Sequence, residues 1–161
     1  MTEVYLPVTK WRRLASDLWI RSEGIHESGA FLLGFRDRNR RCIVEWILYD
    51  DVDPHCLDSG IVVLDGQYLS KLWKYCRDNA LEVVADVHTH PGIARQSFDD
   101  RENPIIAIPG HIALIVPWFA KPPVDVDKLG IYEYLGERRW RKLLPTALVT
   151  GMHEGGPSAR R

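Results

Sequence analysis

Residues 81–100 read LEVVADVHTHPGIARQSFDD, a short valine-rich run followed by two histidines, a serine and an aspartate pair. The run over residues 81–87 is typical of a buried β-strand, which would carry His88 and His90 at its end. Side chains two positions apart on a strand point to the same face, so both imidazoles can reach one ion. The Pro-Gly pair that follows stops the strand and turns the chain back. The segment therefore predicts a strand that ends in a metal-binding pair.

The turn after this strand allows a third ligand to return from the next segment, and Asp100 is the candidate. Two neutral imidazoles and one carboxylate suit Zn²⁺, and three protein ligands leave a fourth position open for water, as in catalytic zinc sites. The metal would lower the pKa of that water towards about 7. The leading hypothesis is therefore a zinc-dependent hydrolase with His88, His90 and Asp100 as ligands.

Each of these residues also has a simpler interpretation. A lone H-x-H at a strand end is common and binds metal in a minority of cases. Ser97 followed three residues later by an acid also fits a helix N-cap. Asp99, Asp100 and Glu102 would then lie in the first turn, where the helix dipole favours anions. The complete order of H-x-H, six residues, Ser, two residues and Asp is more specific than any one part.

An upstream acid adds a second feature. Glu27 lies in the segment HESGAFLLGF, where it precedes a small-residue pair and a strongly apolar run over residues 30–35. A carboxylate at the mouth of a buried strand can lie beside the metal water and take its proton, which metal-assisted hydrolysis requires. Alternatively, Glu27 is a solvated residue in a loop between a helix and a strand.

Together these residues resemble the motif of the JAMM (MPN) metalloprotease family, which has an upstream Glu, then H-x-H, a spacer, Ser, two residues and Asp. The matching residues are Glu27, His88, His90, Ser97 and Asp100. The chain departs from the usual pattern twice: the spacer before Ser97 is six residues instead of seven, and Ala30 replaces a usual Gly. Moving the register by one would select Phe98 and Arg101, which cannot do the chemistry, so a shorter loop explains the spacing better.

The similarity extends over residues 5–142 and includes GHIALIVP and LGIYEYLG, which resemble the prokaryotic, deubiquitinase-like branch. It implies an MPN-type fold similar to cytidine deaminase, and a Glu27 that activates water beside the zinc. Ser97 would help to stabilise the tetrahedral oxyanion. Family substrates are amide or isopeptide bonds after the C-terminus of a ubiquitin-like protein. The implied partners are such a protein or its conjugate. Bacterial members act either beside activating and conjugating enzymes of the same pathway or on small sulfur-carrier proteins, and the sequence does not choose between them.

The rest of the chain predicts a single α/β domain over residues 1–150, with a mixed β-sheet flanked by α-helices. Apolar residues at helical spacing indicate helices over residues 9–22 and 66–79. The predicted strands span residues 4–8, 30–35, 42–49, 81–87, 112–116, 130–135 and 138–144. The polar loop over residues 50–60 is expected to form part of the substrate groove. Residues 151–161 are expected to be a disordered tail.

Composition and charge are compatible with a single globular domain and give no sign of nucleic-acid binding. A length of 161 residues with 45% hydrophobic content is enough for one sizeable core. A net charge of -1 gives no sign of a nucleic-acid surface. The basic stretch over residues 36–41 is expected to form a solvated hairpin tip. A second basic stretch, residues 138–142, is interpreted as the outer face of a late strand or helix, with contact to an acidic partner left open.

Cysteine usage and the N-terminus indicate the compartment. The three cysteines, Cys42, Cys56 and Cys76, form no C-x-x-C pair, so neither a disulfide framework nor a cysteine metal site is predicted. No basic segment followed by a long apolar one is present at the N-terminus, and no run approaches the length of a membrane span. We therefore expect a cytoplasmic protein without membrane contacts.

Two rival interpretations remain at this stage. D-x-H-T-H also begins some amidohydrolase-type and PHP-type metal enzymes, but there it belongs to the first strand of a barrel of about 250 residues. Here it occurs halfway along a chain of 161 residues, which argues against a barrel. The second rival is a non-catalytic, MPN-like binding or scaffold module, whose members lack the ligands. His111 opens a later strand and is interpreted as a structural histidine.

Overall fold

The computed structural model describes residues 1–151, so the predicted disordered tail lies almost entirely outside the described residues. Eight strands form one sheet in the order β7-β6-β5-β4-β2-β3-β1-β8. The strands are β1 (Glu3–Tyr5), β2 (Gly29–Asp37), β3 (Arg40–Leu48), β4 (Glu82–Thr89), β5 (Ile112–Val116), β6 (Gly130–Gly136), β7 (Arg139–Leu143) and β8 (Leu148–Val149). The α-helices are α1 (Val8–Ser22), α2 (Tyr49–Val52), α3 (Leu69–Asp78) and α4 (Phe98–Glu102). Short 3₁₀ segments are η1 (Gly66–Tyr68), η2 (Trp118–Ala120), η3 (Val126–Lys128) and η4 (Pro145–Ala147).

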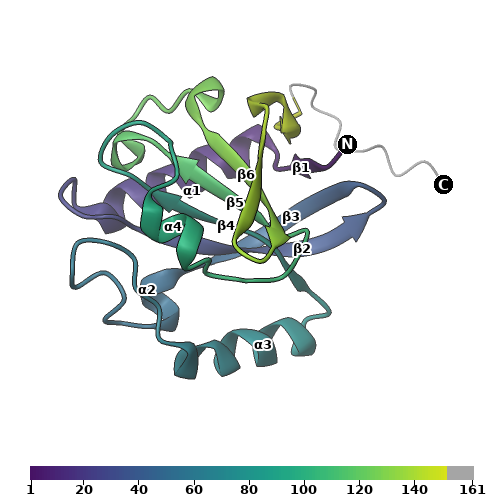
Figure 1. Cartoon of the computed structure of the whole chain (residues 1–161), viewed down its shortest axis with the longest axis horizontal. Helices are drawn as coiled ribbons and strands as arrows, with labels where there is room; N and C mark the ends of the chain where they lie inside the picture. Colours follow the sequence, from purple (N-terminus) through teal and green to yellow (C-terminus); the bar gives the residue numbers. More distant parts are fainter. Residues whose placement is uncertain (152–161) are drawn as a thin grey trace.

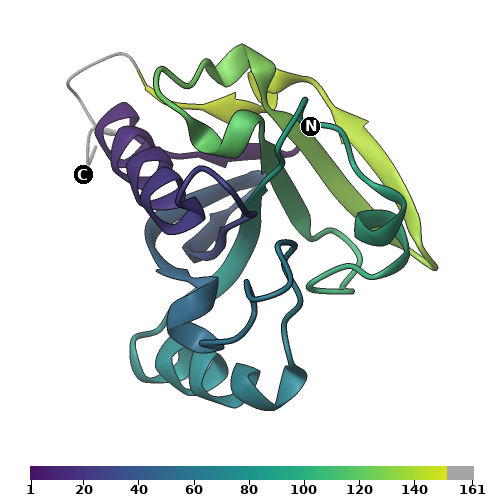
Figure 2. The ribbon, with the colours of Figure 1, turned by 90° about the vertical axis from the view of Figure 1, so that its left-hand side faces the viewer.

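The sheet is mixed, as predicted. Strand β4 lies near its centre and pairs antiparallel with β2 and parallel with β5. Strands β5, β6 and β7 continue as an antiparallel run, whereas β1 pairs parallel with both β3 and β8. Helix α1 covers one part of the sheet, and α2 and α3 lie together below another (Figures 1 and 2). The α/β fold class is therefore confirmed.

Residues 29–34 of strand β2 are buried on both faces, which explains why this part of its sequence is a continuous apolar run instead of an alternating one. Ala30 and Leu32 face the core under α1, where Leu14 and Leu18 are fully buried. On the opposite face Phe31 and Leu33 join a second core that includes Tyr49 of α2 and Leu72 of α3. These two cores fix the central strands, and the strands in turn position the polar side chains at the end of β4.

A glycine lets β2 approach β4 at the point where the histidines begin. Gly29 is paired with His88 across the two strands. A Cβ atom at Gly29 would lie 2.3 Å from the Tyr49 ring and 2.6 Å from the carbonyl oxygen of Val87. No side chain fits there without displacing an aromatic ring that is itself fully buried. The glycine therefore keeps the beginning of β2, and the Glu27 that precedes it, close to the end of β4.

Several element boundaries differ from the sequence prediction. The first strand ends at Tyr5, and α1 begins at Val8 because Pro7 is its N-cap residue. The predicted helix over residues 66–79 begins as the 3₁₀ turn η1 before α3 starts at Leu69. The predicted loop over residues 50–60 contains most of the short helix α2.

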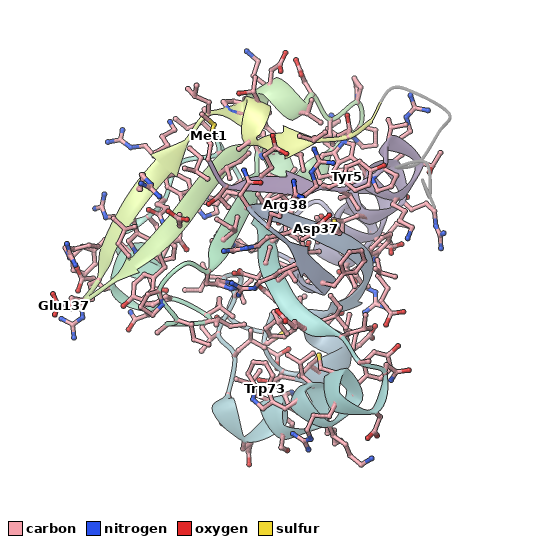
Figure 3. The ribbon with its side chains drawn as sticks, turned by 90° about the vertical axis from the view of Figure 1, so that its right-hand side faces the viewer. Met1, Tyr5, Asp37, Arg38, Trp73 and Glu137 are labelled. Carbon is pink, nitrogen blue, oxygen red and sulfur yellow. The ribbon has the colours of Figure 1, made fainter. Side chains whose placement is uncertain are left out.

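Both basic stretches lie on hairpins. Figure 3 labels Asp37 and Arg38 at the turn between β2 and β3, and Glu137 at the tip of the β6–β7 hairpin. Arg41 is an exception to the predicted solvated tip, because it is only 7% exposed and burial lowers the pKa of its guanidinium. Within residues 1–151 no helix is both long and apolar enough to cross a bilayer.

Candidate metal centre

His88 lies near the end of β4, and His90 directly follows the last residue of this strand. Both side chains are buried, and their Nε2 atoms lie 3.0 Å apart. The residue between them, Thr89, serves a different purpose, because its Oγ1 accepts a hydrogen bond from the backbone N–H of Ser28 at 2.9 Å. The predicted alternation is therefore present, and the two imidazoles converge on one point.

Asp100 reaches the same point from α4. Its Oδ1 lies 3.2 Å from His88 Nε2, and its Oδ2 lies 3.0 Å from His90 Nε2. One ligand atom from each of the three residues lies within 4.8 Å of the others, so the group could hold a metal ion. The structure thus brings together all three residues that the sequence selected as ligands.

A capping box orients the carboxylate of Asp100. Ser97 is the N-cap of α4, and its Oγ accepts a hydrogen bond from the Asp100 backbone N–H at 3.0 Å. In return, Asp100 Oδ2 accepts one from the Ser97 backbone N–H at 2.8 Å. The N-cap interpretation of Ser97 is therefore confirmed, and it is compatible with a ligand role for Asp100 because Oδ1 remains directed at His88.

Glu27 approaches the cluster from the segment between α1 and β2. Its Oε2 lies 3.8 Å from His90 Nε2, and its Oε1 accepts a hydrogen bond from the Val62 backbone N–H at 3.3 Å. The Glu27 backbone N–H donates to the carbonyl oxygen of Gly60 at 2.9 Å. Only 13% of the Glu27 side chain is exposed, so the alternative of a solvated loop residue is wrong.

Burial and charge act against each other on these groups. Burial raises the pKa of Glu27 above its usual value, although His88 and His90 oppose the effect. For Asp100, burial would also raise the pKa, but hydrogen bonds to His88 and His90 outweigh it and hold the pKa far below its usual range. For His88, burial favours the neutral ring, yet the hydrogen bond and charge of Asp100 prevail and raise its pKa. Without a metal, the cluster therefore favours a charged Asp100 paired with a protonated imidazole.

The raised pKa of His88 predicts that metal affinity increases as the pH rises above about 6.5, because this imidazole must lose a proton to become a ligand. In the metal-free protein the raised pKa of His88 contributes stability below about pH 6.5, and this contribution is lost as the pH rises through the folded-state pKa. Metal-free protein should therefore lose this contribution at the same pH at which metal binds more tightly. Competition titrations and thermal unfolding across the pH range test both trends. A metal affinity that did not change with pH would contradict this protonation scheme.

The cluster opens into a cavity of about 260 Å³. Its apolar lining includes Ile61, Val62, Ile105 and Trp140, and its polar lining includes Glu27, Ser97 and Asp99. The predicted groove loop, residues 50–60, does not line this cavity, but the two residues that follow it do. The candidate ligands His88 and Asp100 therefore lie in the wall of a largely apolar cavity.

The sequence analysis did not select Asp86, a buried acid that lines this cavity. Asp86 precedes His88 by two positions on β4, and its Oδ1 lies 2.6 Å from His111 Nε2. Tyr49 donates a hydrogen bond to Asp86 Oδ2 at 2.7 Å, and burial together with the nearby Asp86 raises the Tyr49 pKa. His111 has the buried, paired environment expected of a structural histidine, although it also lines the cavity. The same two-residue spacing that selected His90 could have indicated Asp86 on the same face.

The chain is similar in sequence to a protein that is named as a probable metalloprotease. No family model matches the chain. It is 28% identical over 129 residues to a protein from Sinorhizobium fredii named "Probable metalloprotease y4jG", and the match covers 79% of this chain and 78% of that protein. With the cluster of His88, His90 and Asp100, this similarity supports a metal-binding site in this chain.

Solved structures share the fold. A protein from Desulfitobacterium hafniense superimposes with a TM-score of 0.69 at 18% identity, covering 91% of each chain. A protein from Salinibacter ruber superimposes with a TM-score of 0.58 at 19% identity, covering 96% of this chain and 94% of the other. At these identities the likeness concerns the architecture alone.

Proposed function

We propose that this protein is a zinc-dependent metallopeptidase of the JAMM (MPN) type. On this proposal it hydrolyses the amide or isopeptide bond after the C-terminus of a ubiquitin-like protein. The observation that carries the proposal is the convergence of His88, His90 and Asp100, with the Glu27 carboxylate 3.8 Å from His90. The similarity to a protein named as a metalloprotease supports it independently.

The donor set fits a zinc ion. Two buried imidazole nitrogens and a carboxylate lie close together, and they supply the nitrogen and oxygen ligands that catalytic zinc sites use. When bound, the ion supplies Lewis acidity, which lowers the pKa of water and polarises a substrate carbonyl. Three protein ligands, not four, are characteristic of a catalytic site, whereas a structural site is closed.

The side chains around the cluster have complementary roles in this proposal. Glu27 Oε2 takes a proton from the attacking water and delivers it to the nitrogen of the leaving amine. Burial, which raises the pKa of Glu27, suits a group that must both accept and return a proton near neutral pH. The Ser97 hydroxyl lines the cavity and helps to stabilise the oxyanion as the carbonyl becomes tetrahedral.

The substrate class rests on the motif and the shape of the cavity. A cavity of about 260 Å³ with apolar walls accommodates a narrow peptide chain, such as an extended C-terminus, better than a folded surface. On this basis the partners are a ubiquitin-like protein or its conjugate, with the activating and conjugating enzymes of its pathway. The proposed location is the cytoplasm, where the free thiols Cys42, Cys56 and Cys76 would remain reduced.

The test combines metal analysis with hydrolysis. We expect wild-type protein purified without added metal to contain close to one zinc per chain, and His88→Ala protein to contain almost none. A chelator should abolish cleavage of a ubiquitin-like protein fused through its C-terminus to a reporter, and zinc should restore it. Wild type that takes up no metal even when zinc is supplied would refute the proposal and favour a scaffold module. Metal without cleavage of any such fusion would refute the substrate class alone.

A further inference from the structure

A second and larger groove adjoins the catalytic cavity. Its volume is about 810 Å³, and it lies between the segment after β4 and the last residues of β7 with Leu144 and Pro145, which follow them. Gln96 lines both spaces, whereas Ile61 and Val62 line only the catalytic cavity. A polypeptide that leaves the catalytic cavity past Gln96 would therefore enter this groove. We call it the basic groove because Arg95, Arg101, Lys128 and Lys142 line it.

The groove carries an excess of positive charge. Four cationic side chains line it and all are exposed: Arg95, Arg101, Lys128 and Lys142. The single acid among its lining residues is Asp127. None of the four cations forms an ion pair with another residue in the described range 1–151. This local excess contrasts with a chain whose net charge is -1, so it is a property of this surface and not of the protein as a whole.

The groove also presents apolar side chains and a strand edge. Ile93 and Leu144 line it and are 64% and 70% exposed. Lys142 and Leu143 belong to β7, which ends the sheet order and has β6 as its neighbour on one side only. Within the described sheet, the backbone N–H and C=O groups on the outer edge of β7 have no neighbouring strand, so they can pair with an added one.

We propose that the basic groove binds an acidic, extended segment of the polypeptide substrate, next to the bond that is cleaved. The four cations would pair with Asp or Glu side chains, and Ile93 and Leu144 would contact apolar residues between them. This inference rests on the proposed function only in calling the bound polypeptide a substrate. The aromatic side chain that lines the groove, Tyr132, is only 6% exposed and offers no stacking surface for bases, so the groove favours a peptide over a nucleic acid.

The test selects peptides from a random heptapeptide library displayed on phage, with immobilised full-length Glu27→Gln protein as bait so that nothing is cleaved. We expect the selected sequences to be enriched in Asp and Glu relative to the unselected library. Binding of a selected peptide, measured by fluorescence anisotropy, should weaken at least about tenfold in a Lys128→Glu/Lys142→Glu variant of the bait. The binding should also weaken as salt is raised, because exposed ion pairs are screened.

The matched control is Lys71→Glu/Lys74→Glu on α3, which changes the net charge equally. Both lysines are exposed, and α3 does not line either space. Equal weakening in both charge variants would overturn the inference, as would peptides without acidic enrichment. Tighter binding of a single-stranded RNA oligonucleotide than of the selected peptides would also overturn it.

The two proposals can fail separately. If wild type cleaves its substrate but the bait selects no acidic peptides, the metallopeptidase proposal stands and the basic groove inference falls. Suppose that acidic peptides bind and that this binding is lost in the Lys128→Glu/Lys142→Glu variant, while the wild type neither binds metal nor hydrolyses substrate. The groove inference then stands without the catalytic proposal.

Discussion

Glu27→Gln protein is expected to hydrolyse substrate about 10²–10⁴-fold more slowly than wild type while keeping its metal. Glutamine has nearly the same shape, and its Oε1 can still accept the hydrogen bond that Val62 donates to Glu27. It cannot take a proton from water at neutral pH, so only the proton-transfer step should fail. Rates of fusion cleavage and elemental analysis on the same preparation measure the two effects.

The control for this experiment is the Glu82→Gln variant. Glu82 lies at the other end of β4, where its carboxylate makes an exposed ion pair with Arg36. Its loss should leave cleavage close to the wild-type rate. Full activity in the Glu27 variant would refute its role as the base. Loss of metal together with activity would show instead that the carboxylate supports the ion.

Asp100→Asn protein is expected to bind metal more than about 100-fold more weakly, because outer-shell changes alone cost 10–100-fold and this one removes the charge of a ligand. The side-chain oxygen of asparagine can still accept a hydrogen bond from the backbone N–H of Ser97, so the cap of α4 can persist. Competition titration with a zinc indicator measures the affinity, and circular dichroism checks that the variant is folded.

The adjacent carboxylate offers a close control. Asp99 also lines the cavity, but its Oδ1 accepts a hydrogen bond from Asn103 Nδ2 at 2.8 Å and it lies outside the metal-ligand group. Asp99→Asn should therefore keep wild-type affinity although the change in charge is the same. If the Asp99 variant lost metal and the Asp100 variant kept it, the two assignments would have to be exchanged.

The strands of the fold could be predicted because the central ones are long and apolar. The valine-rich run before His88 and the apolar run after Glu27 both form strands close to the predicted places. Short elements could not be predicted in this way, since β8 has two residues and α2 has four. They depend on tertiary contacts, because such segments are too short to show a hydrophobic period.

For the site, the spacing of the motif identified the residues that converge but not what holds them. The pairing of Asp86 with His111 depends on the parallel register of β4 and β5, which is not visible in local sequence. The burial of Glu27 depends on the segment that ends at Val62. This segment is distant from Glu27 in the sequence, and its apolar residues show no regular spacing. Catalytic roles for Glu27 and Ser97 stay predictions until activity is measured.

The position of Asp100 on α4 has a mechanical consequence. This helix has five residues and buries none of them. Besides its capping box, its contacts include a hydrogen bond from Trp140 Nε1 to the carbonyl oxygen of Arg101 and an ion pair between Glu102 and Arg138. Figure 2 shows it beside the β6–β7 hairpin. An ion shared by His88, His90 and Asp100 would therefore act as a cross-link that closes a short chain loop and fastens α4 to the central strand. Without the ion, the link between α4 and β4 would rest on the weaker pairing of Asp100 with His88 and His90, so loss of the metal should loosen one wall of the cavity.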